Sequence, residues 1–223
     1  GESSGEVSLA ELFNNPEQLI AESKIDIEEL AYLVCRGGWP MATMTPNRKA
    51  ALKQAKIYYD GVVGSGNGED SDISRADGVR RDPERVKRLM RSLSRHQGTS
   101  ASHDTIYQDM ANNDDSTLNR DTISSYIAAL KLIFVVEDMT AWNPALRSKT
   151  AIRTSDTRYF VDPSIAVAAL RVGPQDLIND LATFGLFFET MAVRDLRVYT
   201  DALDGNVYHY RDRNELECDA VIH

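Results

Sequence analysis

Apolar residues recur at helical spacing over most of the chain before residue 132. In the segment Glu84–His96, four of them stand at positions i, i+3, i+4 and i+7, which places them on one side of a helix: Val86, Leu89, Met90 and Leu93. The same criterion predicts helical structure over residues 8–34, 48–59, 102–110 and 119–132. The last two helices start at Ser102 and Asn119, residue types that cap helix N-termini.

The pattern changes after residue 132. The runs Phe134–Val136 and Arg158–Asp162 are predicted to pair as strands on either side of a long basic loop. Three helices, a strand, a basic loop and a second strand, in that order, are typical of a winged helix.

The last third of the chain mixes helices and strands. A short helix is predicted over Pro163–Arg171, and a longer one from about Gln175 to Tyr199 with a break at Gly185. Two strands, Val207–Arg211 and Glu215–Ile222, follow. The sequence therefore predicts a mainly α fold with an α/β C-terminal part.

Composition narrows the class of protein. Hydrophobic residues make up 42% and charged residues 26% of the 223 positions, an ordinary globular balance. No apolar run approaches the ~18 residues of a membrane span, and the acidic, polar first residues are unlike a signal peptide. Cys35 and Cys218 form no CxxC pair, which favours a reduced compartment and argues against a structural zinc site. We therefore expect a cytoplasmic protein with no membrane partner.

Charge is segregated along the chain. The net charge is −9, which argues against a general nucleic-acid coat. Between Arg75 and Arg95, however, there are eight basic and three acidic residues, and between Arg147 and Arg158 there are four basic residues and one acidic one. These two segments are the candidates for contact with an anionic partner.

The predicted winged helix suggests a DNA interface. Such a domain places its third helix in the major groove while flanking cations hold phosphates. With residues 119–132 as that helix and the loop after Val136 as the wing, the predicted DNA contacts are Arg88, Arg91, Arg95, Arg120, Ser124, Lys131, Arg147, Lys149 and Arg153. A competing interpretation stays open, because winged helices also dock proteins and basic helix faces are commonly only solvated. Duplex or branched DNA and a protein are both candidate partners.

A second candidate site consists of carboxylates in the last third. Strand alternation places Glu215, Glu217 and Asp219 on one face, where they repel one another unless they are solvated or bound to a cation. Glu189 lies on the apolar stripe of its helix, which is costly for an unpaired charge. A helical Glu facing two strand acids is how a metal-dependent nuclease site begins. Glu189, Glu217 and Asp219 are thus candidate metal ligands, and Glu189 and Asp219 are candidate catalytic residues.

The same carboxylates have a simpler explanation. The alternative is a solvated edge strand and a Glu189 that pairs with an arginine or caps a backbone. The residues favour this alternative over catalysis, because the basic residue that a nuclease site needs is not visible here.

No motif for nucleotide binding or hydrolysis accompanies these residues. The sequence contains no GxxxxGK[ST], GxSxG or HExxH, and Gly64, Gly66 and Gly68 do not fit GxGxxG. The four histidines show no ligand spacing. No cofactor is therefore predicted in this chain.

Several short motifs together resemble a known family. In chain order they are Arg36–Pro40, Asp72–Arg75, Thr122–Leu130, Trp142–Pro144, Tyr159–Ser164, Gly185–Glu189, Tyr210–Arg211 and Glu217–Asp219. Their order and spacing resemble the C-terminal half of a widespread prokaryotic group of AAA-type ATP-binding proteins. In that group a P-loop ATPase core precedes a domain of unknown function.

The resemblance implies three parts. Residues 1–76 would be the helical end of the AAA-type module, residues 77–162 a winged-helix domain, and residues 163–223 a truncated α/β domain of the PD-(D/E)XK nuclease-like, restriction-endonuclease-like kind. Glu189 would match the helical acid and Asp219 the strand acid of a divalent-metal site.

The resemblance also implies features outside this sequence. The core that binds ATP and Mg lies upstream in the family, and a strand with a Glu-x-Lys-like motif follows soon after the position of His223. We therefore expect this sequence to be part of a longer ATPase and neither to hydrolyse ATP nor to cut DNA by itself. As an accessory region it would couple DNA binding to the ATPase core.

Overall fold

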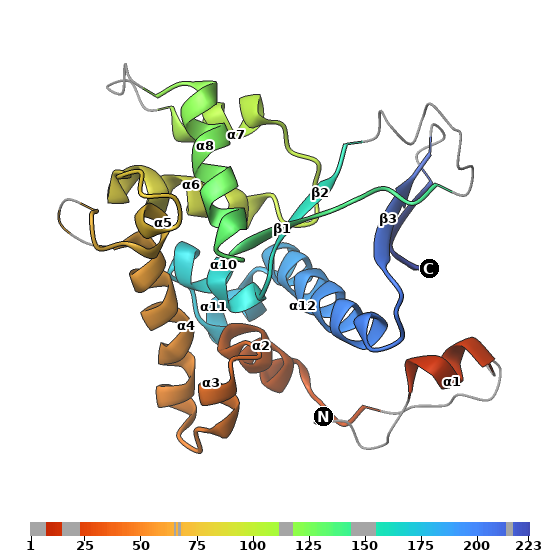
Figure 1. Cartoon of the computed structure of the whole chain (residues 1–223). Helices are drawn as coiled ribbons and strands as arrows, with labels where there is room; N and C mark the ends of the chain where they lie inside the picture. The colour runs from red at the N-terminus through yellow and green to blue at the C-terminus, as the bar shows by residue number, and fades with distance from the viewer. Residues whose placement is uncertain are drawn as a thin grey trace.

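The computed structural model describes residues 8–14, 23–64, 66, 68–111, 118–143, 155–212 and 216–223 (Figure 1). Its helices are α1 (Leu9–Asn14), α2 (Ile27–Arg36), α3 (Pro40–Met44), α4 (Arg48–Val63), α5 (Asp72–Arg75), α6 (Pro83–Arg95), α7 (His103–Met110), α8 (Arg120–Leu132), α10 (Pro163–Leu170), α11 (Pro174–Asn179) and α12 (Leu181–Asp201). Its strands are β1 (Val136–Met139), β2 (Thr157–Phe160), β3 (Val207–Arg211) and β4 (Glu217–Ile222).

This composition of elements confirms the coarse fold class. The described chain is mostly helical with two small antiparallel sheets, as expected for a mainly α protein with an α/β C-terminal part. No described helix has the length and apolarity that crossing a membrane requires.

Capping side chains fix the starts of α7 and α8. Ser102 Oγ accepts a hydrogen bond from the Thr105 N–H at 3.1 Å, and Asn119 Oδ1 accepts one from the Thr122 N–H at 2.8 Å. Such a cap contributes about 0.5–2 kcal/mol to helix stability. Both predicted caps are confirmed.

Helix α10 lies at the centre of the hydrophobic core (Figure 1). Its sequence is apolar on nearly every side, and Ile165 and Ala166 are fully buried. Helices α2, α4, α6 and α12 pack around it, which covers the apolar surface that such a helix exposes in isolation. One cluster of buried residues runs from α2 to α12. The core therefore does not divide at residues 76 and 162, and the three-part division stays a prediction.

The segment Arg36–Pro40 docks onto the start of α10. The buried carboxylate of Asp162 accepts hydrogen bonds from the Gly38 N–H at 2.8 Å and from Arg194 Nη1 of α12 at 2.7 Å. Gly37 has a φ of 73°, and a Cβ there would lie 2.4 Å from Asp162 Oδ1, so only glycine fits. Two motifs that carry the family resemblance therefore join α2 to α10 and α12.

Strand β2 has a neighbour on each side. On one side β1 pairs with it in antiparallel register, with Val136 opposite Phe160. On the other side Thr99, which lies between α6 and α7, forms an antiparallel bridge with Arg158. Within the described residues of this region, Thr99, β2 and β1 therefore lie side by side, next to α6, α7 and α8 in the sequence.

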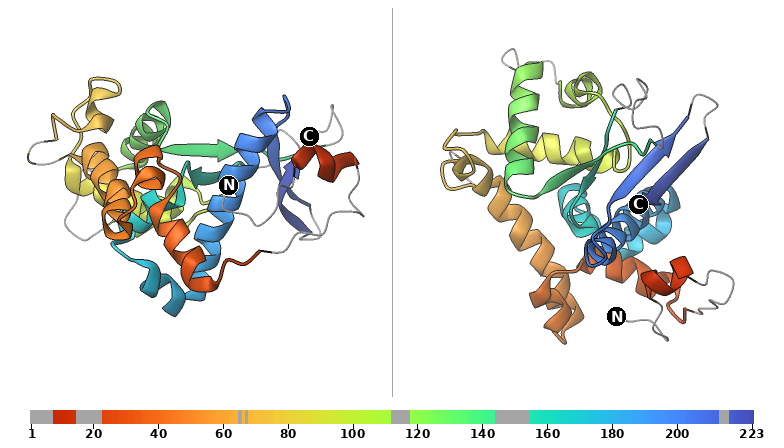
Figure 2. Two further views of the ribbon diagram at one scale, coloured as in Figure 1. Left: turned by 90° about the horizontal axis from the view of Figure 1, so that it is seen from below. Right: turned by 45° about the vertical axis from the view of Figure 1, so that its right-hand side comes forward.

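The second sheet joins the first at its edge. Ala141, just after β1, forms a parallel bridge with His209 of β3. Strands β3 and β4 pair antiparallel, with an irregularity in register between Tyr208 and Tyr210. Figure 2 shows this hairpin standing beside α12, which it contacts.

Two helical predictions differ in detail from the structure. The helical stretch predicted over residues 8–34, with a second helix opening at Pro16 after Asn15, contains α1 and α2; residues 23–26 are non-helical, and Asp26 caps α2 by accepting from the Glu29 N–H at 2.7 Å. The predicted break at Gly185 lies instead at Asp180, which caps α12. In both places an acidic cap, rather than the apolar pattern, decides where the helix starts.

A strand is predicted over Phe134–Val136, but β1 begins at Val136, two residues after the predicted start. Phe134 has a left-handed backbone with a φ of 55°, so it forms part of the turn after α8. The partner strand, predicted over Arg158–Asp162, begins one residue earlier than predicted and spans Thr157–Phe160.

Candidate nucleic-acid interface and neighbouring carboxylates

Helix α8 is the helix predicted to enter a DNA groove. Its buried side includes Ile123, Ile127 and Leu130, and it packs against α5, α7 and β1. This packing therefore sets the rotation of α8 about its own axis. The rotation in turn decides which side chains of α8 face solvent.

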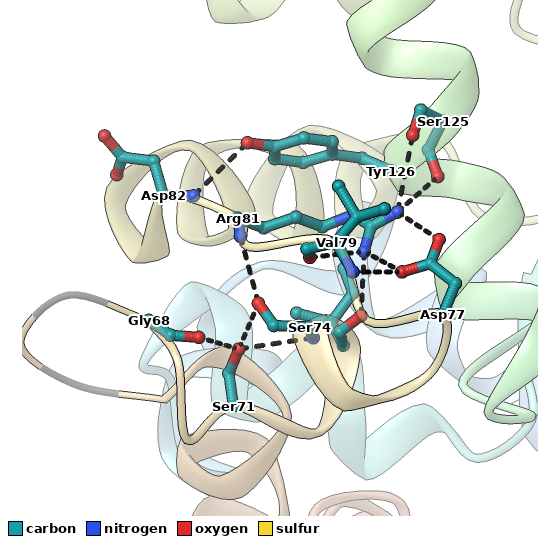
Figure 3. Close-up of polar contacts among 10 residues, drawn as sticks. Gly68, Ser71, Ser74, Asp77, Val79, Arg81, Asp82, Ser125 and Tyr126 are labelled. Atoms are coloured by element: carbon teal, nitrogen blue, oxygen red, sulfur yellow. Dashed lines mark hydrogen bonds and ion pairs between the residues drawn. The ribbon is translucent and has the colours of Figure 1, made fainter.

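Arg81 ties α8 to the loop before α6 (Figure 3). Its side chain is fully buried, and its guanidinium forms two hydrogen bonds of 2.7 Å with the Asp77 carboxylate. It also donates to the backbone oxygen and the hydroxyl of Ser125 in α8, at 3.3 Å each. The hydrogen bond from Arg81 lowers the pKa of Asp77 to about 2. This charged network joins α8 to the loop before α6.

The three side chains of α8 that were predicted to contact DNA all have protein partners. Arg120 pairs with Asp104 of α7, and Lys131 pairs with Asp138 of β1. Ser124 Oγ lies 2.9 Å from His103 Nδ1, within hydrogen-bond distance. These residues therefore face α7 and β1 rather than open solvent alone.

The most exposed stripe of α8 carries different residues. Asp121, Ser125, Ala128 and Leu132 are exposed and share one side of the helix. Phe134, directly after the helix, is 73% exposed. This outward stripe holds one acid and no base, so any attraction for phosphates must come from its neighbours.

The predicted contacts on α6 face two other elements. Arg95 lies 3.6 Å from Asp109 of α7. Arg91 is exposed. It lies near Tyr59 of α4, because the positive charge of Arg91 lowers the pKa of Tyr59, which burial raises to about 12. Arg88 is half-buried.

The last three predicted contacts, Arg147, Lys149 and Arg153, lie outside the described residues. Among the six described contacts, those of α8 lie towards α7 and β1, whereas Arg95 of α6 lies towards α7 and Arg91 towards α4.

The predicted carboxylate cluster surrounds Glu189 of α12. Tyr159 Oη donates a hydrogen bond to Glu189 Oε1 at 2.7 Å. Burial raises the pKa of Glu189, the bond from Tyr159 lowers it, and the negative charges of Asp219 and Glu217 raise it further. The three candidate metal ligands are therefore close enough to interact. Among the described residues, the hydrogen-bond partner of Glu189 is Tyr159 rather than an arginine or a backbone group.

Exposure is uneven within this cluster. Glu217 and Asp219 are exposed on β4, whereas Glu189 is half-buried against Gly98, where a Cβ would lie 2.2 Å from Glu189 Oε1. In the part of the chain that the structure describes, no three side chains of His, Cys, Asp or Glu are arranged to hold a metal ion. The divalent-metal site stays a prediction.

Sequence reasoning missed two residues beside this cluster, Tyr159 and His209. His209 is only 6% exposed, and its Nε2 has no hydrogen-bond partner among the described residues. Burial lowers the pKa of His209, which favours the neutral imidazole. No local pattern could have shown these contacts, since Tyr159 and Glu189 are 30 positions apart.

Comparison with known proteins places the chain in a family without assigning an activity. No curated protein and no solved structure matches the chain. The resemblance to AAA-type ATP-binding proteins therefore stays a prediction. A family model described as a domain of unknown function (DUF8612) matches residues 27–176, from the start of α2 into α11. Because this match covers two thirds of the 223 residues, the chain belongs to the DUF8612 family.

Proposed function

We propose that residues 83–160 form a winged helix that binds duplex DNA through its wing and through α8. The observation that carries this proposal is the order and pairing of the elements. The segments α6, Thr99, α7, α8, β1 and β2 follow one another, and Thr99 and β1 lie on the two sides of β2. This is the order in which winged-helix domains arrange their helices, their short first strand and their wing.

The wing would supply the charge that the outward stripe of α8 lacks. The sequence between β1 and β2 contains Arg147, Lys149 and Arg153. Cations beside a groove-binding helix neutralise phosphates and fix its register on the duplex. Arg120 supports the same binding, because its exposed pairing with Asp104 is worth at most about 1 kcal/mol and a phosphate can replace that partner.

Fluorescence anisotropy with labelled duplex and four-way-junction DNA tests this proposal. The variant Arg147→Ala/Lys149→Ala/Arg153→Ala should weaken binding and reduce the slope of log K against log salt by up to about 3, since each lost phosphate contact removes about 0.9. The matched control removes three exposed cations elsewhere: Lys24→Ala/Lys49→Ala/Arg211→Ala. An equal loss in both variants would mean that only net charge matters. No binding by the unaltered chain at low salt would refute the proposal.

Protein docking is a second candidate, and one observation favours it. The exposed stripe of α8 ends in Leu132 and is followed by the exposed Phe134, which suits an apolar partner better than a phosphate backbone. Leu132→Ser/Phe134→Ser separates the two functions. If this variant binds DNA as tightly as the unaltered chain, the wing makes the DNA contact. If the unaltered chain does not bind DNA, protein docking is left as the function of this surface.

The resemblance to AAA-type proteins extends the proposal to a longer protein. There the winged helix would couple DNA binding to an ATPase core that holds ATP and Mg. Glu189, Glu217 and Asp219 would be half of a divalent-metal site. This part rests on the family resemblance and on the closeness of the three carboxylates. A rise of the melting temperature with Mn²⁺, lost in Asp219→Asn, would support the metal site.

A further inference from the structure

A cavity of about 550 Å³ opens between α4, α6 and α10. Its apolar wall includes Leu52 of α4, Val167 of α10 and Val172 just after α10. A cavity of this volume is the size of a small-molecule site. All of its lining residues fall within residues 27–176, the segment that the family model matches.

Four cations surround this cavity, and one acid, Asp60, is present among its lining residues. The cations are Lys53, Lys56, Lys87 and Arg171. With Asp60 and with Glu84, which pairs with Lys87, the four cations leave an excess of two positive charges in a chain whose net charge is −9. A cleft lined by one sign of charge with apolar walls concentrates counter-ions. The cavity therefore attracts anions.

These cations are available to a ligand. Within the described residues, Lys53 and Arg171 form no ion pair. Lys56 pairs with Asp60 on the same helix, and Lys87 pairs with Glu84 at 2.7 Å. Both pairs lie at the surface, where such pairs stabilise a protein little, so an anion that contacts several cations at once can displace them.

Arg171 occupies an unusual backbone conformation. It ends α10 in the left-handed region, with φ of 60° and ψ of 39°, where glycine is the common residue. Strained conformations of this kind gather at functional sites. Arg171 also offsets the carbonyl groups at the end of α10. That role explains Arg171 and the ion pairs explain Lys56 and Lys87, which leaves Lys53 without a structural role among the described residues.

We propose that this cavity binds a phosphate-bearing organic molecule of nucleotide size. The phosphate contacts the four cations, and the organic part lies against Leu52, Val167 and Val172. Such a phosphate has two sources, a free nucleotide and the phosphorylated 5′ end of a nucleic acid. The site is distinct from the proposed DNA interface, because neither α8 nor β1 nor β2 lines the cavity.

Isothermal titration calorimetry without magnesium tests the site with four probes: ATP, AMP, adenosine and a 5′-phosphorylated hexanucleotide. At least one phosphorylated probe should bind, and adenosine should bind at least about tenfold more weakly than AMP if the free nucleotide is the ligand. Lys53→Gln/Arg171→Gly should lower the affinity by about tenfold or more. Glycine suits the backbone at position 171, so this variant should keep its melting temperature.

The control is Lys49→Gln, which changes an exposed lysine of α4 outside the cavity and should bind like the unaltered chain. Binding of ATP or AMP identifies the free nucleotide as the source, and binding of the hexanucleotide alone identifies a nucleic-acid end. No binding of any probe, or equal binding by the double variant, overturns the proposal. The wing variant should keep this binding, so failure of the DNA proposal and failure of this one are distinguishable.

Discussion

Two groups of cations in the described part of the chain differ in what neutralises them. On α8, Arg120 and Lys131 each pair with an acid on a neighbouring element. Around the cavity between α4, α6 and α10, Lys53 and Arg171 form no ion pair within the described residues. A basic segment of sequence therefore becomes a basic surface only where the fold brings no acid against it. For α8, neighbouring acids largely cancel the charge that the sequence suggests.

The largest expected effect comes from Arg81, which holds α8 in its observed rotation about the helix axis. That rotation decides which side chains of α8 face solvent and which face neighbouring acids. Arg81→Met should destabilise the chain by about 1–3 kcal/mol, because the backbone oxygens of Ile73 and Ser125 lose a charged hydrogen-bond donor. Urea unfolding followed by circular dichroism measures the change. Arg80→Met removes an exposed cation 3.6 Å from Glu69 and should cost less than about 1 kcal/mol.

Acid titration sharpens the Arg81 prediction. The pKa of Asp77 is lowered from 3.8 to about 2, so its contribution to stability is present above pH 3.8 and is lost as the pH falls towards 2. Asp77→Asn should remove this part of the acid-unfolding curve. If Arg81→Met were as stable as Arg80→Met, the fixed rotation of α8 would have to be abandoned.

Local features of the fold were predictable from sequence. Ser102 and Asn119 were correct as caps because a cap depends on residues two or three positions away. Strand Val207–Arg211 was also predicted with its correct bounds, since alternation and a turn define it locally. Glu217 and Asp219 lie close enough to Glu189 to raise its pKa, and whether the three carboxylates form a metal site stays a prediction.

Features that depend on distant contacts were not predictable. The most exposed stripe of α8 runs through Asp121 and Ala128, whereas Arg120 is exposed but paired with Asp104 and Ser124 is half-buried against His103. Packing against α5, α7 and β1 sets this rotation. A rotation of about 100°, one residue along a helix, exchanges a basic face for an acidic and apolar one. The cavity was missed for a related reason, because its cations come from three separate helices.

The second test of the comparison removes one acid from each basic surface. Asp104→Asn frees Arg120 and should strengthen DNA binding about two- to fivefold, corresponding to about 0.5–1 kcal/mol for an exposed pair. Asp60→Asn frees Lys56 and should strengthen binding of the phosphorylated probe at the cavity by a similar factor, with DNA affinity unchanged. Anisotropy and calorimetry measure the two affinities. If both variants changed both affinities equally, the surfaces would share one diffuse field and would not be separate sites.

The smallest effect concerns Glu189, whose pKa is raised by burial and by the negative charges of Asp219 and Glu217 and is lowered by no described cation. The pKa of Glu189 is raised, chiefly by burial, so between its unfolded value near 4.5 and its folded value the folded state binds more protons. Stability therefore falls as the pH rises through this window and stays reduced above it. Glu189→Gln carries no charge and keeps an acceptor for the Tyr159 hydroxyl. It should melt at most a few degrees higher than the unaltered chain at pH 8, where about 1 kcal/mol corresponds to about 2–4 °C in a chain of this size.

Thermal melts of Glu189→Gln from pH 4 to pH 8, beside the exposed control Glu28→Gln, measure this gain. The gain should vanish below pH 4.5, because Glu189 is then protonated in both states. The same melts in the presence of Mn²⁺ test whether the carboxylates bind a metal ion. An ion that joins Glu189 to Asp219 would stabilise the unaltered chain at pH 8 and reverse the order of the two melts. A gain independent of both pH and Mn²⁺ would show that Glu189 only packs against Tyr159 and Gly98, and that its charge has no role in this cluster.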